Sequence, residues 1–304
     1  MKKRQLGSSD LYVSEIGLGC MSLGTEEKKA RSIIDEAIDR GINYLDTADL
    51  YDYGLNESIV GKSIRHQREQ IVLATKIGNH WEEGKEGWFW DPSRKYLKEA
   101  VKNSLHRLQT DYIDLLQLHG GTIEDPIDEM IETFEELKKE GYIRYFGISS
   151  IRPNVIKRFL NQSSVVSVMM QYSLLDRRPE EWFNLIQEHQ VSVIARGPLA
   201  KGLLTNRPLS QVSQKMRENG YLDYSIDELE SLLLQISEVA SDLTLNQKAL
   251  QYILSNEVVG TVVPGASTIE QVRDNLKVER ELTKEEYKML QSITKSNIYQ
   301  QHRT

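Results

Sequence analysis

IVLATK at residues 71–76, DPSRKYLKEAVKNSLHRL at 91–108 and YIDLLQLH at 112–119 follow one another closely in this chain. The first and last segments are short and almost continuously apolar, which is typical of parallel strands that are buried on both faces. The middle segment begins with Asp91 and Pro92 and then carries apolar residues three or four positions apart, the pattern of an amphipathic helix. The stretch therefore predicts two parallel strands joined by a helix.

The same alternation extends along the whole chain. The other strand-like segments are IGLGCM (16–21), INYLDT (42–47), RYFGISS (144–150), VVSVMMQY (165–172), VSVIARG (191–197) and VVGTVVPG (258–265). A second clear helix is DPIDEMIETFEELKKEG (125–141), in which Asp125 is suited to cap the start and Gly141 to end it. Strand and helix segments that alternate eight times favour a closed (β/α)8 barrel, the TIM barrel, over an open doubly wound sheet. We expect one α/β domain over residues 1–304, with its active site at the C-terminal ends of the strands.

Composition excludes several classes of protein. The chain is 39% hydrophobic and 27% charged, as in an ordinary globular protein, and its net charge of −7 argues against nucleic-acid binding. A single cysteine cannot form an internal disulfide, and the N-terminus lacks the apolar stretch of a signal peptide, so we expect a cytoplasmic protein. No run approaches the roughly 20 apolar residues that span a bilayer, and the six histidines form no close ligand pair, so we expect neither a membrane segment nor a metal. A monomer is the default expectation.

Polar residues at the ends of the predicted strands carry the chemistry. Asp46, Lys76 and His119 each end an apolar segment, and Tyr51 follows the first of them by five positions. A phenol is a poor proton shuttle near neutral pH until a nearby cation favours its ionised form, and Lys76 can be that cation. Asp46 can hold the ammonium, and His119 can donate a hydrogen bond to a carbonyl oxygen. Singly each could be an ordinary loop or capping residue, but together they predict proton-coupled reduction of a carbonyl.

The segments GINYLDTADLYDYGLNE, VLATKIG and YIDLLQLHGG make the chain resemble the aldo-keto reductase superfamily along nearly its whole length. The resemblance implies a catalytic tetrad of Asp46, Tyr51, Lys76 and His119, with Tyr51 as the general acid in reduction and the general base in oxidation. It also implies a nicotinamide cofactor and a small-molecule carbonyl substrate.

The resemblance further implies which residues hold that cofactor. They are Gly19, Cys20, Met21, Asp46, Ser149, Ser150, Gln171, Arg196, Gly197, Leu199, Lys201, Gly202, Gly265, Ser267, Thr268, Gln271 and Asn275. Gln171 would bind the nicotinamide carboxamide. PGAST directly precedes a helical segment, whose free amide donors suit a nucleotide phosphate, although a simple Ser/Thr helix cap is the alternative.

Two other features bear on the cofactor. GLGCMSLG (17–24) begins like a Rossmann fingerprint but has Ser22 where the third glycine belongs, so we interpret it as a barrel strand end. The chain also departs from the commoner family pattern at Ser150, at Arg196 in place of a tyrosine that stacks on nicotinamide, and at Ser267 and Gln271 in place of arginine. We expect NADPH as the cofactor. NADH is possible, because the arginine that usually binds the 2′-phosphate in the family is replaced.

Aromatic residues gather in the loop after Lys76. Trp81, Trp88 and Trp90 could form an apolar substrate pocket, or equally a latch that fixes the loop to the barrel. The leading prediction is NADPH-dependent reduction of aldehydes or ketones to alcohols. A sugar or polyol dehydrogenase working in reverse and a nicotinamide-sensing subunit with slow turnover are the alternatives. A phosphate-sugar isomerase lacks an obvious enolising glutamate.

Overall fold

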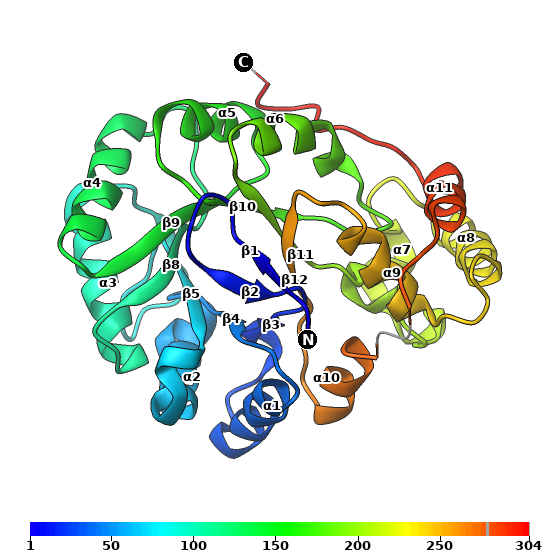
Figure 1. Ribbon diagram of the computed structural model, residues 1–304, viewed down its shortest axis with the longest axis horizontal. Helices are drawn as coiled ribbons and strands as arrows, with labels where there is room; N and C mark the ends of the chain where they lie inside the picture. Colours follow the sequence, from blue (N-terminus) through cyan, green and yellow to red (C-terminus); the bar gives the residue numbers. More distant parts are fainter. Residues whose placement is uncertain (278–279, 304) are drawn as a thin grey trace.

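Eight parallel strands form the barrel that the alternation predicts, as the computed structural model shows (Figure 1). The barrel strands are β3 (Leu18–Gly19), β4 (Tyr44–Asp46), β5 (Val72–Ile77), β8 (Ile113–Leu118), β9 (Ile143–Ser149), β10 (Ser167–Gln171), β11 (Ser192–Arg196) and β12 (Val259–Val263). They neighbour one another in chain order, and parallel bridges from Ile16 to Val262 and from Gly19 to Gly265 join the last strand to the first. The structure describes residues 1–277 and 280–303, so residues 278, 279 and 304 of the expected domain lie outside it.

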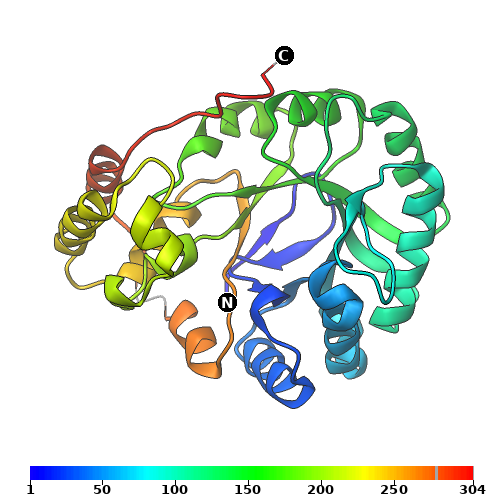
Figure 2. The ribbon, with the colours of Figure 1, turned by 180° about the vertical axis from the view of Figure 1, so that it is seen from behind.

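Helices surround the barrel on its outer side (Figure 2). They are α1 (Glu27–Asp39), α2 (Leu55–Ile64), α3 (Arg94–Leu108), α4 (Ile127–Lys139), α5 (Pro153–Gln162), α6 (Phe183–Glu188), α7 (Gln214–Asn219), α8 (Ile226–Glu238), α9 (Leu245–Leu254), α10 (Ile269–Asn275) and α11 (Lys284–Ile293). One apolar core lies between these helices and the outer faces of the strands. The (β/α)8 prediction is thus confirmed.

Two helix starts differ from the sequence prediction. The cap of α3 is Ser93, which accepts from the Tyr96 backbone N–H, whereas Asp91 accepts from the backbone N–H of Ser93. Asp125 does not cap α4, because its carboxylate accepts from the indole N–H of Trp90 at 3.0 Å. Local spacing cannot reveal such a partner, since Trp90 comes from another loop.

An N-terminal hairpin closes one mouth of the barrel (Figure 1). Its antiparallel strands are β1 (Lys3–Gln5) and β2 (Tyr12–Ser14). The buried residues Leu6, Leu11 and Val13 pack in one cluster with side chains from inside the barrel. The Gly7 backbone N–H donates to Ser192 Oγ at the start of β11, so the hairpin lies at the N-terminal ends of the strands. The opposite, C-terminal end is therefore the end available for a site.

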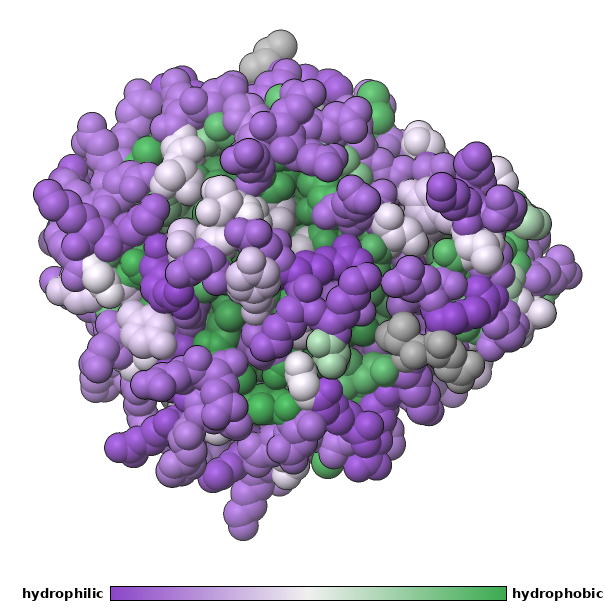
Figure 3. Space-filling model, viewed as in Figure 1, coloured by the Kyte–Doolittle hydropathy of each residue, from purple (hydrophilic) through white to green (hydrophobic). Residues whose placement is uncertain are grey.

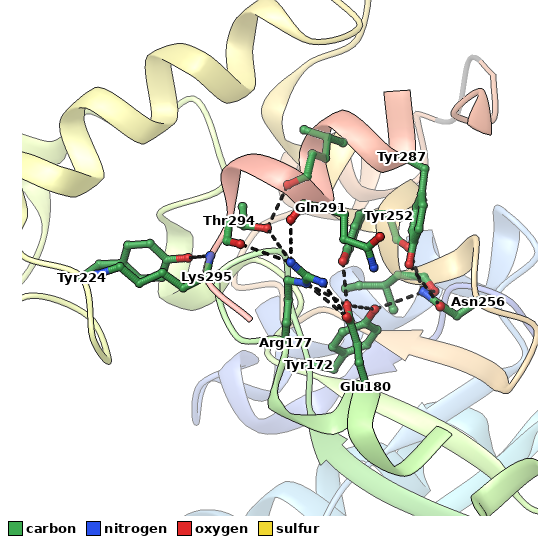
Figure 4. A network of polar contacts seen from close by, with 12 residues as sticks. Tyr172, Arg177, Glu180, Tyr224, Tyr252, Asn256, Tyr287, Gln291, Thr294 and Lys295 are labelled. Atoms are coloured by element: carbon green, nitrogen blue, oxygen red, sulfur yellow. Dashed lines mark hydrogen bonds and ion pairs between the residues drawn. The ribbon is translucent and has the colours of Figure 1, made fainter. Parts of the chain in front are cut away.

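The C-terminal helix is tied to the loop after β10. Arg177 Nη1 donates to the backbone carbonyl oxygens of Gln291 at 2.7 Å and Thr294 at 3.2 Å (Figure 4). The face in Figure 3 is mostly hydrophilic, with hydrophobic side chains showing in places between hydrophilic ones. Among the described residues, no helix is long and apolar enough to cross a membrane.

Candidate active site

Three predicted catalytic residues end neighbouring strands on one face of the barrel. Asp46 is the last residue of β4, Lys76 is the last but one of β5, and His119 follows β8 directly. The parallel register places Asp46 beside Ala74 and Lys76 beside Gln117. Since these strands are adjacent in the barrel, three side chains that are distant in sequence converge.

Lys76 is the centre of this cluster. Its ammonium donates to Asp46 Oδ2 at 2.6 Å, to the Thr47 carbonyl oxygen at 2.7 Å and to Tyr51 Oη at 3.2 Å. An ammonium has three hydrogens, so all of its donors are used. Burial alone would lower the pKa of Lys76, but the neighbouring Asp46 and Tyr51 hold it above its usual range. The lysine is therefore a fixed positive charge beside the phenol.

Gln117 is a second hydrogen-bond donor to Asp46 that the sequence analysis did not predict. Its Nε2 donates to Asp46 Oδ1 at 3.1 Å, so each carboxylate oxygen has one donor. The position on β8, two residues before His119, is a signal that could have found it, because residues two apart in a strand point to the same face. Gln117 thus fixes Asp46 from inside the barrel.

His119 is held as a neutral imidazole. Burial, together with the positive charges of Lys76 and Arg196, lowers the pKa of His119 to about 3. Its ring meets that of Tyr51 edge to face, with centroids 6.0 Å apart. Nδ1 is buried and has no hydrogen-bond partner among the residues that the structure describes. A neutral imidazole beside the phenol can donate one hydrogen bond to a substrate oxygen.

Tyr51 begins a turn of unusual backbone conformation. Asp52 and Tyr53 have φ values of 48° and 50°, and Gly54 has a φ of 83°. The left-handed region is unfavourable for residues with a Cβ atom, so two such residues in succession need support from their surroundings. The proton-donating candidate therefore lies on a backbone that the rest of the molecule must hold.

The predicted nicotinamide-binding residues end the next three strands. Ser149, Gln171 and Arg196 are the last residues of β9, β10 and β11. Gln171 Oε1 accepts from Arg196 at 3.3 Å, and Gln171 Nε2 donates to the Tyr221 hydroxyl at 3.2 Å. Sequence reasoning missed Tyr221, which comes from the long segment after β11. Ser150, which follows Ser149, is buried, and its hydroxyl accepts from the Arg152 backbone N–H.

The remaining predicted cofactor residues follow β11 and β12. Gly197, Leu199, Lys201 and Gly202 lie after β11, and Gly265, Ser267, Thr268, Gln271 and Asn275 lie after β12 and on α10. Thr268 caps α10 by accepting from the Gln271 backbone N–H, and Gln271 Oε1 accepts from Ser267 N at 2.7 Å and Oγ at 3.1 Å. Asn275 Oδ1 accepts a hydrogen bond from Asn246 Nδ2.

The residues after the first barrel strand differ in exposure. Gly19 ends β3, and Met21 is 63% exposed, whereas Cys20 is fully buried. The Cys20 thiol lies 3.7 Å from the Leu18 carbonyl oxygen, and the Cys20 carbonyl accepts from Asn56. Burial raises the pKa of this thiol. Cys20 therefore supports the strand end from within, and of these three residues only Met21 presents a side chain to solvent.

The three tryptophans of the loop after β5 occupy different environments. Trp90, on the short hairpin β6 (Asn79–His80) and β7 (Phe89–Trp90), lies so close to Gly78 that a Cβ atom there would come within 2.5 Å of its ring. It also lies against Gly120, next to His119. Trp81 contacts the turn after Tyr51, and Trp88 is 55% exposed. The loop is thus fixed by two tryptophans and presents the third to solvent.

The donor set along these strand ends fits a nicotinamide dinucleotide. Gln171 offers a primary amide for a carboxamide, and Ser267 and Gln271 offer polar groups for a ribose or phosphate. Lys201 and Arg196 are exposed and have no carboxylate within ion-pair distance among residues 1–277 and 280–303, so both cations can meet an anion.

Comparisons with known proteins agree with this geometry. The model of the Aldo/keto reductase family matches residues 15–295. The chain is 63% identical over 306 residues to the uncharacterised oxidoreductase YqkF of Bacillus subtilis, covering 100% of both chains. It is 30% identical to an NADH-specific methylglyoxal reductase of Escherichia coli, covering 91% of this chain and 93% of that one. The holo form of aldo-keto reductase AKR11C1 from Bacillus halodurans superposes with a TM-score of 0.95 at 61% identity, and each chain is covered completely.

Proposed function

Since the chain belongs to the aldo/keto reductase family and is an oxidoreductase of the NAD(P)H-dependent type, we propose that it reduces aldehydes or ketones to alcohols with NADPH. The observation that carries this proposal is the hydrogen-bonded series from Gln117 through Asp46 and Lys76 to the Tyr51 hydroxyl. It places a proton donor beside a fixed positive charge at the open end of the barrel.

Each side chain of the cluster has one task in this reaction. When bound, the nicotinamide would provide the hydride that the carbonyl carbon accepts. Tyr51 gives its proton to the carbonyl oxygen, and Lys76 stabilises the phenolate that remains. Neutral His119 donates a hydrogen bond to the same oxygen, which polarises the carbonyl group. Asp46 keeps Lys76 in place, and in the oxidation direction Tyr51 accepts the proton instead.

The residues proposed to hold the cofactor divide by chemistry. Gln171, with Ser149 and Ser150 beside it, would bind the carboxamide. Lys201, within the segment from Gly197 to Gly202, would meet the pyrophosphate as an exposed cation. The adenosine end would be surrounded by residues on and before α10, namely Gly265, Ser267, Thr268, Gln271 and Asn275. The other side of the cofactor would be covered by the residues at the end of β3, namely Gly19, Cys20 and Met21.

The reverse reaction, oxidation of an alcohol with NAD+ as the hydride acceptor, is the second candidate, because α10 offers no free arginine for a 2′-phosphate. Its Arg273 is held by Glu36, with nitrogen–oxygen distances of 2.8 and 3.2 Å. Positions 267 and 271 carry the uncharged Ser267 and Gln271. A sugar or polyol dehydrogenase would prefer NAD+ and NADH over their 2′-phosphorylated forms, so the cofactor preference separates the two candidates.

Parallel fluorescence titrations with NADPH and NADH, followed by an aldehyde panel in the same cuvette, test the proposal. Tight NADPH binding and rapid aldehyde-dependent oxidation are the expected result. An NADH preference would favour the dehydrogenase, and tight binding without turnover would favour a nicotinamide-sensing subunit.

We propose apolar or aromatic aldehydes as the preferred substrates, with Trp88 and Trp90 contributing to the pocket wall. Trp90 lies against Gly120, next to the histidine that polarises the carbonyl, and Trp88 is exposed nearby on the same loop. A higher kcat/KM for an aromatic aldehyde than for glucose is expected. Equal values for the two substrates would contradict this assignment.

A further inference from the structure

The turn that carries Tyr51 is left-handed at three successive residues, two of which have side chains. Asp52, with φ 48° and ψ 36°, and Tyr53, with φ 50° and ψ 50°, lie immediately after the proposed proton donor. Such residues persist only where the surrounding structure holds them, and they cluster at functional sites. The groups that hold this turn therefore also decide where the Tyr51 hydroxyl lies relative to Lys76.

Trp81 contacts the turn at two points. Its indole N–H donates to the Asp49 carbonyl oxygen at 3.0 Å, just before Tyr51. Its ring meets the ring of Tyr53 edge to face at 5.7 Å, just after Tyr51. The Trp81 side chain therefore contacts the backbone before the proposed proton donor and a side chain after it.

Arg107, from α3, supports Trp81 and the end of the turn. Its guanidinium lies 5.7 Å from the centre of the Trp81 ring, and its side chain packs so closely on Gly54 that a Cβ atom there would come within 2.6 Å of Arg107 Cδ. Gly54 can take this place because it has no Cβ atom.

Buried Glu57 fixes Arg107 in turn. Glu57 Oε2 accepts from Arg107 Nε at 2.7 Å, and Oε1 accepts from the Thr75 hydroxyl at 2.5 Å. The Glu57 side chain is fully buried, and Thr75 precedes Lys76 on β5. The supporting contacts therefore run from the sequence neighbours of Tyr51 to Thr75, the residue before Lys76.

We propose that Trp81, Arg107 and Glu57 form a clamp that holds the left-handed turn and so positions the Tyr51 hydroxyl against Lys76. Trp81 is then a positioning residue of the reaction and not only part of a substrate wall. This inference rests on the proposed function, because it assumes that Tyr51 gives the proton.

Trp81→Leu tests the clamp, with Trp182→Leu as the matched control. Trp182 is more deeply buried than Trp81, and it lies near the C-terminal segment, where Arg303 packs on its ring. We expect kcat of Trp81→Leu to fall about 10- to 100-fold, the scale of loss that a misplacement of about 1 Å costs. KM and the cofactor Kd should stay within about twofold, since ground-state binding does not use this turn. The control should keep its kcat per folded molecule.

Asp52→Gly distinguishes positioning of Tyr51 from a general loss of stability, because it changes only the support that the turn needs. Glycine adopts the left-handed conformation without steric cost, so the turn needs less support. The double variant Trp81→Leu with Asp52→Gly should therefore recover several-fold of the lost kcat. An unchanged kcat in Trp81→Leu, a loss confined to KM, or no recovery in the double variant would each overturn the clamp.

Failure of the clamp can be told apart from failure of the proposed function. If the unmodified protein shows no aldehyde-dependent cofactor oxidation, the proposed function fails. If it turns over and Tyr51→Phe does not, while Trp81→Leu behaves like the control, only the clamp fails.

Discussion

Two clusters in this protein combine a carboxylate, a cation and tyrosine hydroxyls, yet they differ in how their polar groups are used. One is Asp46, Lys76 and Tyr51 at the C-terminal end of the barrel. The other, which we call the Glu180 cluster, consists of Tyr172, Arg177, Glu180 and Tyr252 (Figure 4).

The Glu180 cluster is saturated. Glu180 Oε1 accepts from the hydroxyls of Tyr252 at 2.6 Å and Tyr172 at 3.0 Å, and Oε2 accepts from Arg177 Nη2 at 2.8 Å. Burial, with Tyr252 and Glu180 nearby, raises the pKa of Tyr172 well above its usual range, so its hydroxyl stays a donor. This cluster ties the loop after β10 to the C-terminal helix.

The cluster of Asp46, Lys76 and Tyr51 has every lysine donor paired, whereas its tyrosine hydroxyl is still accessible. Lys76 uses all three donors, whereas Tyr51 is only half-buried and His119 Nδ1 lacks a partner among the described residues. The same kinds of polar group therefore stabilise a fold where each is paired, and they can serve a reaction where one hydroxyl is left accessible.

Tyr51→Phe should have the largest effect of the substitutions in the two clusters, and the effect should be on kcat. Removing the proposed general acid should lower kcat about 10²- to 10⁴-fold and leave the cofactor Kd nearly unchanged. Stopped-flow or steady-state turnover with an aldehyde, together with fluorescence titration, measures both. The exposed neighbour Tyr53→Phe is the control and should turn over normally. Near wild-type turnover in Tyr51→Phe would refute the assigned acid.

Glu180→Leu should affect stability and not chemistry. It leaves the guanidinium of Arg177, which is only 5% exposed, without its carboxylate, and breaking such a buried pair costs about 3–5 kcal/mol of unfolding free energy. Urea unfolding should show this loss, with kcat per folded molecule retained. Glu99→Leu, at an exposed position of α3, should cost little. A drop in kcat at unchanged stability would show that the Glu180 cluster takes part in the reaction.

His119 should make the stability of the protein sensitive to acid. In the folded protein burial lowers the pKa of His119 to about 3, whereas the ordinary histidine pKa of 6.5 applies when the chain unfolds. Between these values the unfolded state binds more protons, so acidification lowers the free energy of unfolding, by about 1–2 kcal/mol between pH 7 and pH 5. His119→Gln should remove this part of the loss, and the exposed His66→Gln should not. Parallel slopes in all three proteins would contradict a neutral His119.

Tyr252→Phe should have the smallest effect and completes the comparison with Tyr51→Phe. Glu180 keeps its bonds to Arg177 and Tyr172, so losing one hydroxyl should cost about 1 kcal/mol of stability. Thermal unfolding measures the loss, and kcat should not change. A kinetic defect without a stability loss would remove the distinction between the two clusters.

Much of the fold followed from local sequence. The eight strand segments were predicted because buried parallel strands are short apolar runs, and all eight are confirmed. The N-terminal hairpin was not predicted, since its strands have only three residues each and carry mostly charged or polar side chains. The catalytic roles of Asp46, Tyr51, Lys76 and His119 remain predictions, although the structure brings these four side chains together.

The sequence by itself determined the order of strands and helices and the residue types at the strand ends, because both depend on periodicity within a few residues. Only the tertiary structure decided that Gln117 binds Asp46, that Tyr252 binds Glu180, and that Trp81 contacts residues on both sides of Tyr51. Asp46 meets Gln117 across 71 positions, and Glu180 meets Tyr252 across 72. Such contacts arise from barrel closure and helix packing, which leave no local pattern in the chain.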